Sequence, residues 1–210
     1  EKMTAQIGTV DAWVQELASY DRITFDMFDT LIYRPFSEPM DLFYFLGETF
    51  EVMNLKQLRI QMEYQARLRA KKERGTMEVT LPEIWQMMEE EIGIPAQKGL
   101  ETELGLERKF CHANPFMLEV WQRLIALGKK PIVVSDMYLP SDFLREILDQ
   151  NGFSGYERVL VSCEESDSKS DGKIYEKLKG EMSSKANEDA ASWIHVGDNP
   201  HRSEEHTSEL

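Results

Sequence analysis

Four short apolar segments stand out along the chain because each is rich in β-branched or aromatic residues and ends at a polar or turn-forming position. Their apolar character is nearly continuous, which is typical of strands buried on both faces of a parallel sheet. We therefore predict strands over residues 23–28, 131–135, 158–162 and 192–196.

Helical periodicity follows three of these four segments. Apolar residues recur at helical spacing over residues 115–125, 142–149 and 172–182, and glycines lie near the ends of the first two segments. Strands that alternate with helices in this way predict an α/β fold, with a doubly wound, Rossmann-like parallel sheet.

The interval between the first two strands is too long for one crossover connection, and it contains no strand pattern. It contains helical patterns instead, over residues 41–50, 55–72, 81–92 and 100–110. We interpret residues 39–111 as an inserted all-helical cap. Residues 1–38 and 112–201 would then form one discontinuous α/β core.

Residues 202–210 differ from the rest of the chain because they are polar throughout and show neither helical nor strand periodicity. They also match, residue for residue, a translation of a common sequencing-library adapter. We treat this tail as non-native and exclude it from the fold. The natural core is then expected to be truncated after His201.

The composition is that of a soluble globular chain, with 210 residues, 41% hydrophobic and 30% charged. Acidic residues outnumber basic ones by 38 to 24, so the net charge is -14. Such a surface repels nucleic acid and anionic lipid, and no apolar run is long enough to span a bilayer. We expect no nucleic-acid partner, no membrane insertion and a cytoplasmic location.

Polar side chains that can take part in catalysis follow the predicted strands. Asp26, Ser135 and Asp198 lie at strand ends, and Lys169 lies in the loop after the third strand. Taken singly, each is more often a helix cap or a solvated charge. Together, at the edge where open α/β sheets bind ligands, they supply a nucleophile, a hydroxyl, a cation and a metal-binding carboxylate. This set predicts phosphoryl transfer.

The order of these residues resembles the four motifs of the haloacid dehalogenase-like (HAD) hydrolases. Residues 25–31 resemble the first motif, residues 133–136 the second, Lys169 the third and residues 196–199 the fourth. The resemblance covers residues 21–201, with the helical insertion where that superfamily has its cap.

Two fuller segments resemble a narrower bacterial subgroup. They are residues 25–31 together with Arg34-Pro35, and residues 135–140. Members of this subgroup are found beside, or fused to, glycosyltransferases of surface-polysaccharide synthesis. The resemblance implies a glycosyltransferase as a partner of this chain.

The resemblance also implies catalytic roles. Asp26 would attack phosphorus and form an aspartyl-phosphate, and Thr30 and Ser135 would hydrogen-bond the phosphoryl oxygens. Lys169 would neutralise the charge that develops in the transition state. The substrate would be a small phosphate monoester, for example a sugar phosphate.

A magnesium ion is implied in the same way. Its ligands would be the carboxylates of Asp26 and Asp198 and the backbone carbonyl of Phe28, which are the hard oxygen donors that Mg²⁺ prefers. Two carboxylates and a phosphate need cations in order to converge, which agrees with this ligand set.

One position departs from the phosphatase pattern. Phosphatases of this superfamily carry a second Asp two residues after the nucleophile, as acid and base for the leaving group, and here that residue is Phe28. Asp29 comes one residue later, and on an extended strand end it would point to the other side. His195, inside the fourth predicted strand, is interpreted as a core or supporting residue rather than a base.

Three functions therefore remain open. Phosphate monoester hydrolysis is the leading hypothesis, with a good leaving group, Asp29 in an irregular turn, or a cap residue replacing the missing acid. A 2-haloacid dehalogenase is the second, because an aromatic residue at position 28 is typical of those enzymes. A weak or inactive module that serves a glycosyltransferase is the third.

Overall fold

The structure is a computed structural model that describes residues 8–165, 177–178, 180–181 and 191–197. It divides into two compact units. An α/β unit contains residues up to Tyr33, His112–Met137 and residues from Ser141 onward, and a helical unit contains Arg34–Cys111 and Tyr138–Pro140. Among the described residues, no helix has both the length and the apolar character that a bilayer span requires.

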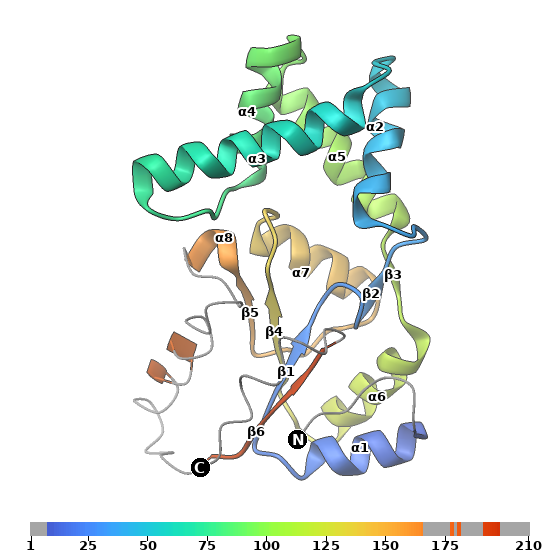
Figure 1. Ribbon diagram of the computed structural model, residues 1–210. Coiled ribbons are helices and arrows are strands. Elements are labelled where there is room, and N and C mark those ends of the chain that lie inside the picture. The colour runs from blue at the N-terminus through green and yellow to red at the C-terminus, as the bar shows by residue number, and fades with distance from the viewer. Residues whose placement is uncertain (1–7, 166–176, 179, 182–190, 198–210) are drawn as a thin grey trace. The chain divides into compact units, whose positions relative to one another are not determined.

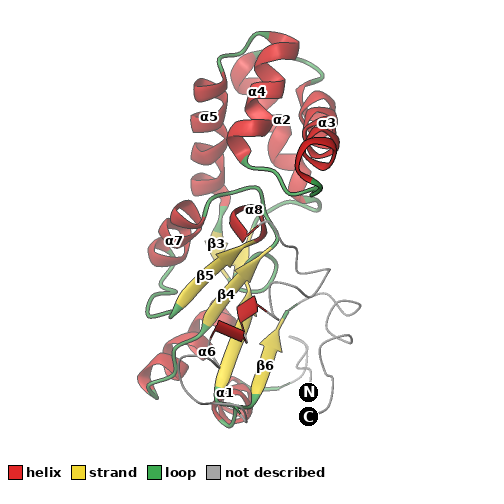
Figure 2. Ribbon diagram, turned by 90° about the vertical axis from the view of Figure 1, so that its left-hand side faces the viewer, coloured by secondary structure: helices red, strands yellow, loops and turns green. Residues whose placement is uncertain are grey.

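A parallel four-stranded sheet forms the centre of the α/β unit (Figures 1 and 2). Its order is β5-β4-β1-β6, and every neighbouring pair is parallel. The strands are β1 (Arg22–Asp26), β4 (Ile132–Ser135), β5 (Arg158–Val161) and β6 (Trp193–Val196). The predicted α/β class and all four predicted strands are confirmed, although β1 ends two residues earlier than expected.

Helices and a small antiparallel sheet of two strands complete this unit. The helix predicted over 115–125 is confirmed as α6, whose Trp121 ring lies 5.3 Å from the Phe25 ring of β1. The helix predicted over 142–149 is also confirmed, whereas most of the segment 172–182 lies outside the described residues. The elements are α1 (Val10–Ala18), β2 (Ile32–Tyr33), β3 (His112–Ala113), α6 (Pro115–Ala126), α7 (Ser141–Gln150) and α8 (Ser162–Glu165).

Hydrogen bonds between Asp21 and Ser192, which directly precede β1 and β6, align the starts of these two strands. The Asp21 carboxylate accepts hydrogen bonds from the backbone N–H of Ser192 at 2.9 Å and from its hydroxyl at 3.0 Å. The Arg22 N–H in turn donates to the Ser192 carbonyl at 2.9 Å. These hydrogen bonds from Ser192 lower the pKa of Asp21. These hydrogen bonds therefore help to set the register along the whole β1–β6 pair.

The helical unit contains the four helices expected from periodicity, of which α5 begins four residues before its predicted start. This compact unit begins at Arg34, and it includes Tyr138, whose carbonyl accepts the Leu81 N–H at 2.8 Å. Its elements are η1 (Pro39–Asp41), α2 (Leu42–Phe50), α3 (Leu55–Arg74), α4 (Leu81–Ile92) and α5 (Ala96–Phe110).

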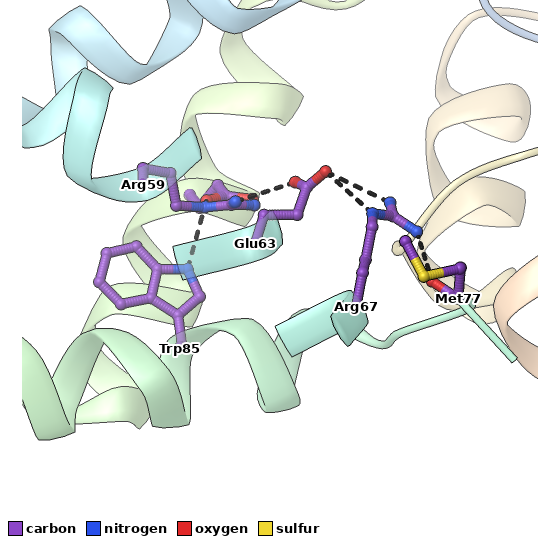
Figure 3. A network of polar contacts seen from close by, with 6 residues as sticks. Arg59, Glu63, Arg67, Met77 and Trp85 are labelled. Atoms are coloured by element: carbon purple, nitrogen blue, oxygen red, sulfur yellow. Dashed lines mark hydrogen bonds and ion pairs between the residues drawn. The ribbon is translucent and has the colours of Figure 1, made fainter. Parts of the chain in front are cut away.

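A buried ion cluster joins three helices of this unit (Figure 3). Arg59 on α3 is fully buried, and its guanidinium donates to both carboxylate oxygens of Glu103 on α5, at 2.7 and 3.0 Å. It also donates to Glu63 at 2.9 Å, while the Trp85 indole N–H of α4 donates to Glu103 at 3.2 Å. Burial lowers the pKa of Arg59 because it disfavours the charged form. The negative charge of Glu103 outweighs this effect, so the pKa of Arg59 is raised.

A second buried group of polar side chains surrounds Glu107, four residues after Glu103 on α5. Glu107 pairs with Arg34 at 2.9 Å and accepts the Cys111 thiol at 3.3 Å. Burial raises the pKa of Glu107 even though Arg34 opposes this shift. Burial and the charge of Glu107 also raise the pKa of Cys111, so this cysteine stays a protonated thiol.

Removal of the buried arginine is expected to destabilise the helical unit strongly. Arg59→Met leaves the Glu103 carboxylate buried without its ion partner, which costs about 3–5 kcal/mol. Arg145→Met, which breaks the exposed pair with Asp142, is the matched control and should change stability by less than about 0.5 kcal/mol. Urea unfolding measures both, and equal effects would contradict the assigned role of the cluster.

The two cysteines should differ in reactivity. Because the thiolate is the reactive form, Cys111, which is buried and has a raised pKa, should resist alkylation in the folded protein. Cys163 is only partly buried and should be labelled first. Iodoacetamide labelling followed by peptide mass spectrometry, with and without urea, measures this order. Equal labelling rates in the folded protein would contradict it.

Candidate active site

Asp26 is the last residue of β1, which lies between β4 and β6. Its side chain is nearly buried, with 8% of the residue exposed. Ser135 ends the neighbouring β4, one residue beyond Val134, the register partner of Asp26. Since carboxyl ends of parallel strands meet at one edge of a sheet, both side chains belong to the edge where α/β proteins bind ligands.

A tight turn follows Asp26 in place of the expected strand end. The Met27 carbonyl accepts the N–H groups of both Leu31 and Ile32, at 2.9 and 3.0 Å. Asp29 adopts a left-handed backbone with φ of 62°, which Asp tolerates better than most residues. The prediction of a strand through Phe28 is therefore wrong. The alternation argument that turned Asp29 away from Asp26 is wrong with it, because the backbone is not extended there.

This turn holds the first hydroxyl of the predicted site. Thr30 is buried, and its Oγ1 atom has no hydrogen-bond partner among the described residues. A buried hydroxyl without a partner carries a desolvation penalty of about 1–3 kcal/mol. Such an atom is suited to hydrogen-bond an anionic ligand, because binding would remove that penalty.

Asn114, which the sequence interpretation missed, fixes the position of the turn. Its side-chain amide donates to the Thr30 carbonyl and to the Tyr33 hydroxyl, both at 3.1 Å, and its backbone N–H donates to the Leu31 carbonyl at 2.8 Å. The same side chain accepts the Phe116 N–H and caps α6. The available signal was an Asn directly before a Pro at a helix start.

Gly197 closes the site on the β6 side. A Cβ atom at this position would lie 2.3 Å from Asp26 Oδ2 and 3.1 Å from Asp26 Cγ. Any side chain would therefore collide with the carboxylate. The glycine of the fourth motif is thus required by the close approach of β6 to Asp26.

His195 also lies beside Asp26. Its Nε2 atom is 3.2 Å from Asp26 Oδ1, and its Nδ1 atom is 2.8 Å from the Thr24 hydroxyl. Thr24 and His195 are register partners in the parallel pair of β1 and β6. The imidazole therefore lies between Asp26 and Thr24, the residue two positions earlier on β1.

The remaining predicted residues lie outside the part of the chain that the structure describes. These are Lys169 and Asp198. Among the described residues, no group of three or more His, Cys, Asp or Glu side chains could hold a metal ion. The Asp26 carboxylate and the Phe28 carbonyl are donors of the kind that suits Mg²⁺, and with Asp198 they remain a predicted ligand set.

Comparison with known proteins supports the fold. No family model and no curated protein sequence matches the chain. The L-2-haloacid dehalogenase of Xanthobacter autotrophicus, with chloropropionic acid covalently bound, superimposes with a TM-score of 0.51 and 14% identity over 84% of this chain and 69% of that chain. A second dehalogenase gives a TM-score of 0.49 and 17% identity over 86% and 77%. The fold of the chain is haloacid dehalogenase-like.

The superposition bears on architecture alone, because 14% identity does not transfer an activity. What this haloacid dehalogenase-like fold supplies is the sheet edge at which Asp26 and Ser135 end their strands.

Gly197→Ala should disturb the site and lower stability, because the new methyl group must displace the Asp26 carboxylate. Overpacking of this kind costs about 1–3 kcal/mol. Gly105→Ala is the matched control, since no atom lies within 4 Å of a Cβ on this helical glycine. That variant should be neutral or more stable by up to about 1 kcal/mol. Thermal unfolding compares the two, and a neutral Gly197→Ala would contradict the close approach.

Proposed function

We propose that the chain is a hydrolase of small phosphate monoesters that acts through an aspartyl-phosphate on Asp26. The observation that supports this most is the buried hydroxyl of Thr30, which has no hydrogen-bond partner within the described part of the chain and lies on the turn that begins directly after Asp26. A nucleophilic carboxylate and a free donor from one short segment suit an electrophile that carries anionic oxygens.

The reaction has two steps. A carboxylate oxygen of Asp26 forms a bond to phosphorus while the bond from phosphorus to the leaving oxygen breaks. Water then attacks phosphorus, which releases inorganic phosphate and restores the carboxylate. Thr30 and Ser135 donate hydrogen bonds to the phosphoryl oxygens, and Lys169 balances their charge. A Mg²⁺ ion bound by Asp26, Asp198 and the Phe28 carbonyl would supply further charge neutralisation.

The leaving group must gain a proton, and position 28 offers no acid. Phe28 is half-buried in the turn and Asp29 is exposed. Residues 27–31 form a turn, so the alternation of side chains along a strand no longer excludes Asp29 as the proton donor. Substrates with good leaving groups, such as sugar 1-phosphates, need the acid least.

A second candidate is 2-haloacid dehalogenation. The aromatic side chain of Phe28 favours it. The L-2-haloacid dehalogenase that superimposes on this chain shows only that a fold of this class can hold that chemistry. In that reaction a carboxylate oxygen of Asp26 would bond to carbon and expel halide. Water would then hydrolyse the ester at the carboxyl carbon of Asp26.

The third candidate is a weak or inactive module that serves a glycosyltransferase of surface-polysaccharide synthesis. It rests on Phe28 and on the subgroup resemblance of residues 25–31, Arg34-Pro35 and residues 135–140. A cytoplasmic location belongs to the same proposal, since nucleotide sugars and sugar phosphates are cytoplasmic compounds.

Phe28→Asp tests this candidate, because restoration of the missing acid should raise phosphate release in an enzyme but leave a binding module without turnover.

Asp26→Asn should abolish phosphate release from a panel of sugar phosphates and aryl phosphates in the presence of Mg²⁺. The amide is too weak a nucleophile to form the intermediate. Asp142→Asn, a change at an exposed carboxylate, is the matched control and should keep the wild-type rate. Equal rates for wild type and Asp26→Asn would contradict the proposal, as would no release by the wild type.

Turnover in isotopically labelled water separates the two reactions. Phosphate hydrolysis should place the heavy oxygen in inorganic phosphate, because water attacks phosphorus. Dehalogenation should place it in Asp26 after repeated turnovers, because water attacks the carboxyl carbon. Mass spectrometry of phosphate and of the Asp26 peptide reads both outcomes, and label in Asp26 with halide release would replace the first function with the second.

A further inference from the structure

We propose that His195 is a positioning residue that fixes the orientation of the Asp26 carboxylate for attack. This role rests on the proposed function, in which Asp26 is the nucleophile. The supporting contacts all lie within the α/β unit: Asp26 Oδ1 is 3.2 Å from Nε2 of the imidazole, and the Thr24 hydroxyl is 2.8 Å from Nδ1.

One hydrogen-bond arrangement makes Nε2 the donor. If the Thr24 hydroxyl donates to Nδ1 at 2.8 Å, the proton of the neutral imidazole is on Nε2 and points at Asp26. Asp26 Oδ1 then accepts from Nε2–H at 3.2 Å.

The sheet register brings the imidazole to this place. Thr24 and Asp26 are two residues apart on β1, so both side chains point to the same face of the sheet. His195 pairs with Thr24 across the β1–β6 ladder and projects on that face as well. A residue at position 195 is therefore a lateral neighbour of both side chains, and histidine is long enough to bridge them.

The contact restricts the Asp26 carboxylate from the β6 side, where Gly197 also borders it, since a Cβ atom on Gly197 would lie 3.1 Å from His195 Nε2. A carboxylate can rotate about its Cβ–Cγ bond, and rotation changes where each oxygen points. Nε2–H holds Oδ1, and the absent side chain at Gly197 leaves room for Oδ2. A fixed carboxylate plane keeps one attacking lone pair aimed at the electrophile, and small misalignments reduce rates strongly.

The experiment compares His195→Phe with His195→Gln in the full chain. Phenylalanine keeps the ring but has no donor, whereas the glutamine amide can place an N–H near Nε2. His195→Phe should lower kcat about 10–100-fold with little change in KM, because the contact acts on the reacting geometry. His195→Gln should recover most of this loss. Thr24→Val, which removes the hydroxyl on Nδ1, should lower kcat about tenfold and keeps the test valid if His195→Phe does not fold.

Formation of a beryllium trifluoride adduct is the second readout, since this probe bonds to a carboxylate as a phosphoryl group does. Fluorine NMR with Mg²⁺ should detect the adduct in wild type and His195→Gln and should show its loss in His195→Phe. Unchanged kcat and adduct in His195→Phe would overturn the role, as would equal losses in both variants. A wild type that forms the adduct but hydrolyses no ester overturns the proposed function alone, and one that does neither overturns both.

Discussion

Asp26 and Gly197 lie so close together that no side chain fits between them, and this packing constraint orders the whole candidate site. It arises from the parallel register of β1 and β6, which the hydrogen bonds between Asp21 and Ser192 align at the other end of the strands. The same register places His195 beside Asp26. One strand pair thus positions Asp26, borders it with Gly197 and places His195 Nε2 3.2 Å from Asp26 Oδ1.

The helical unit depends on a buried ion cluster around Arg59 and not on a close approach of two strands. Arg59 is fully buried, yet Glu103 and Glu63 accept its hydrogen bonds, and the Glu103 carboxylate also accepts the Trp85 indole N–H. Neutralisation within the unit makes such burial tolerable, since an unpaired charge there would be strongly destabilising. Arg59 is therefore a structural residue and not a free cation for an anionic substrate.

Sequence patterns predicted the sheet well because buried parallel strands are nearly continuous apolar runs, and they located Asp26 and Ser135 at its edge. They failed at residues 27–31, where an apolar run continues past Asp26 but the backbone turns at Asp29. They also missed Asn114 and the ion cluster around Arg59, because these depend on which segments meet in space. The contact of His195 with Asp26 required the strand register, which periodicity does not provide.

The proposed reaction requires that Asp26 carries a covalent phosphoryl group during turnover. Acid quenching during turnover of a sugar phosphate with Mg²⁺, followed by peptide mass spectrometry, detects this intermediate. The peptide containing Asp26 should gain the mass of one phosphoryl group, and Asp26→Asn should show no such gain. A phosphoryl group on another residue, or phosphate release with no modified Asp26 peptide under any quench time, would contradict it.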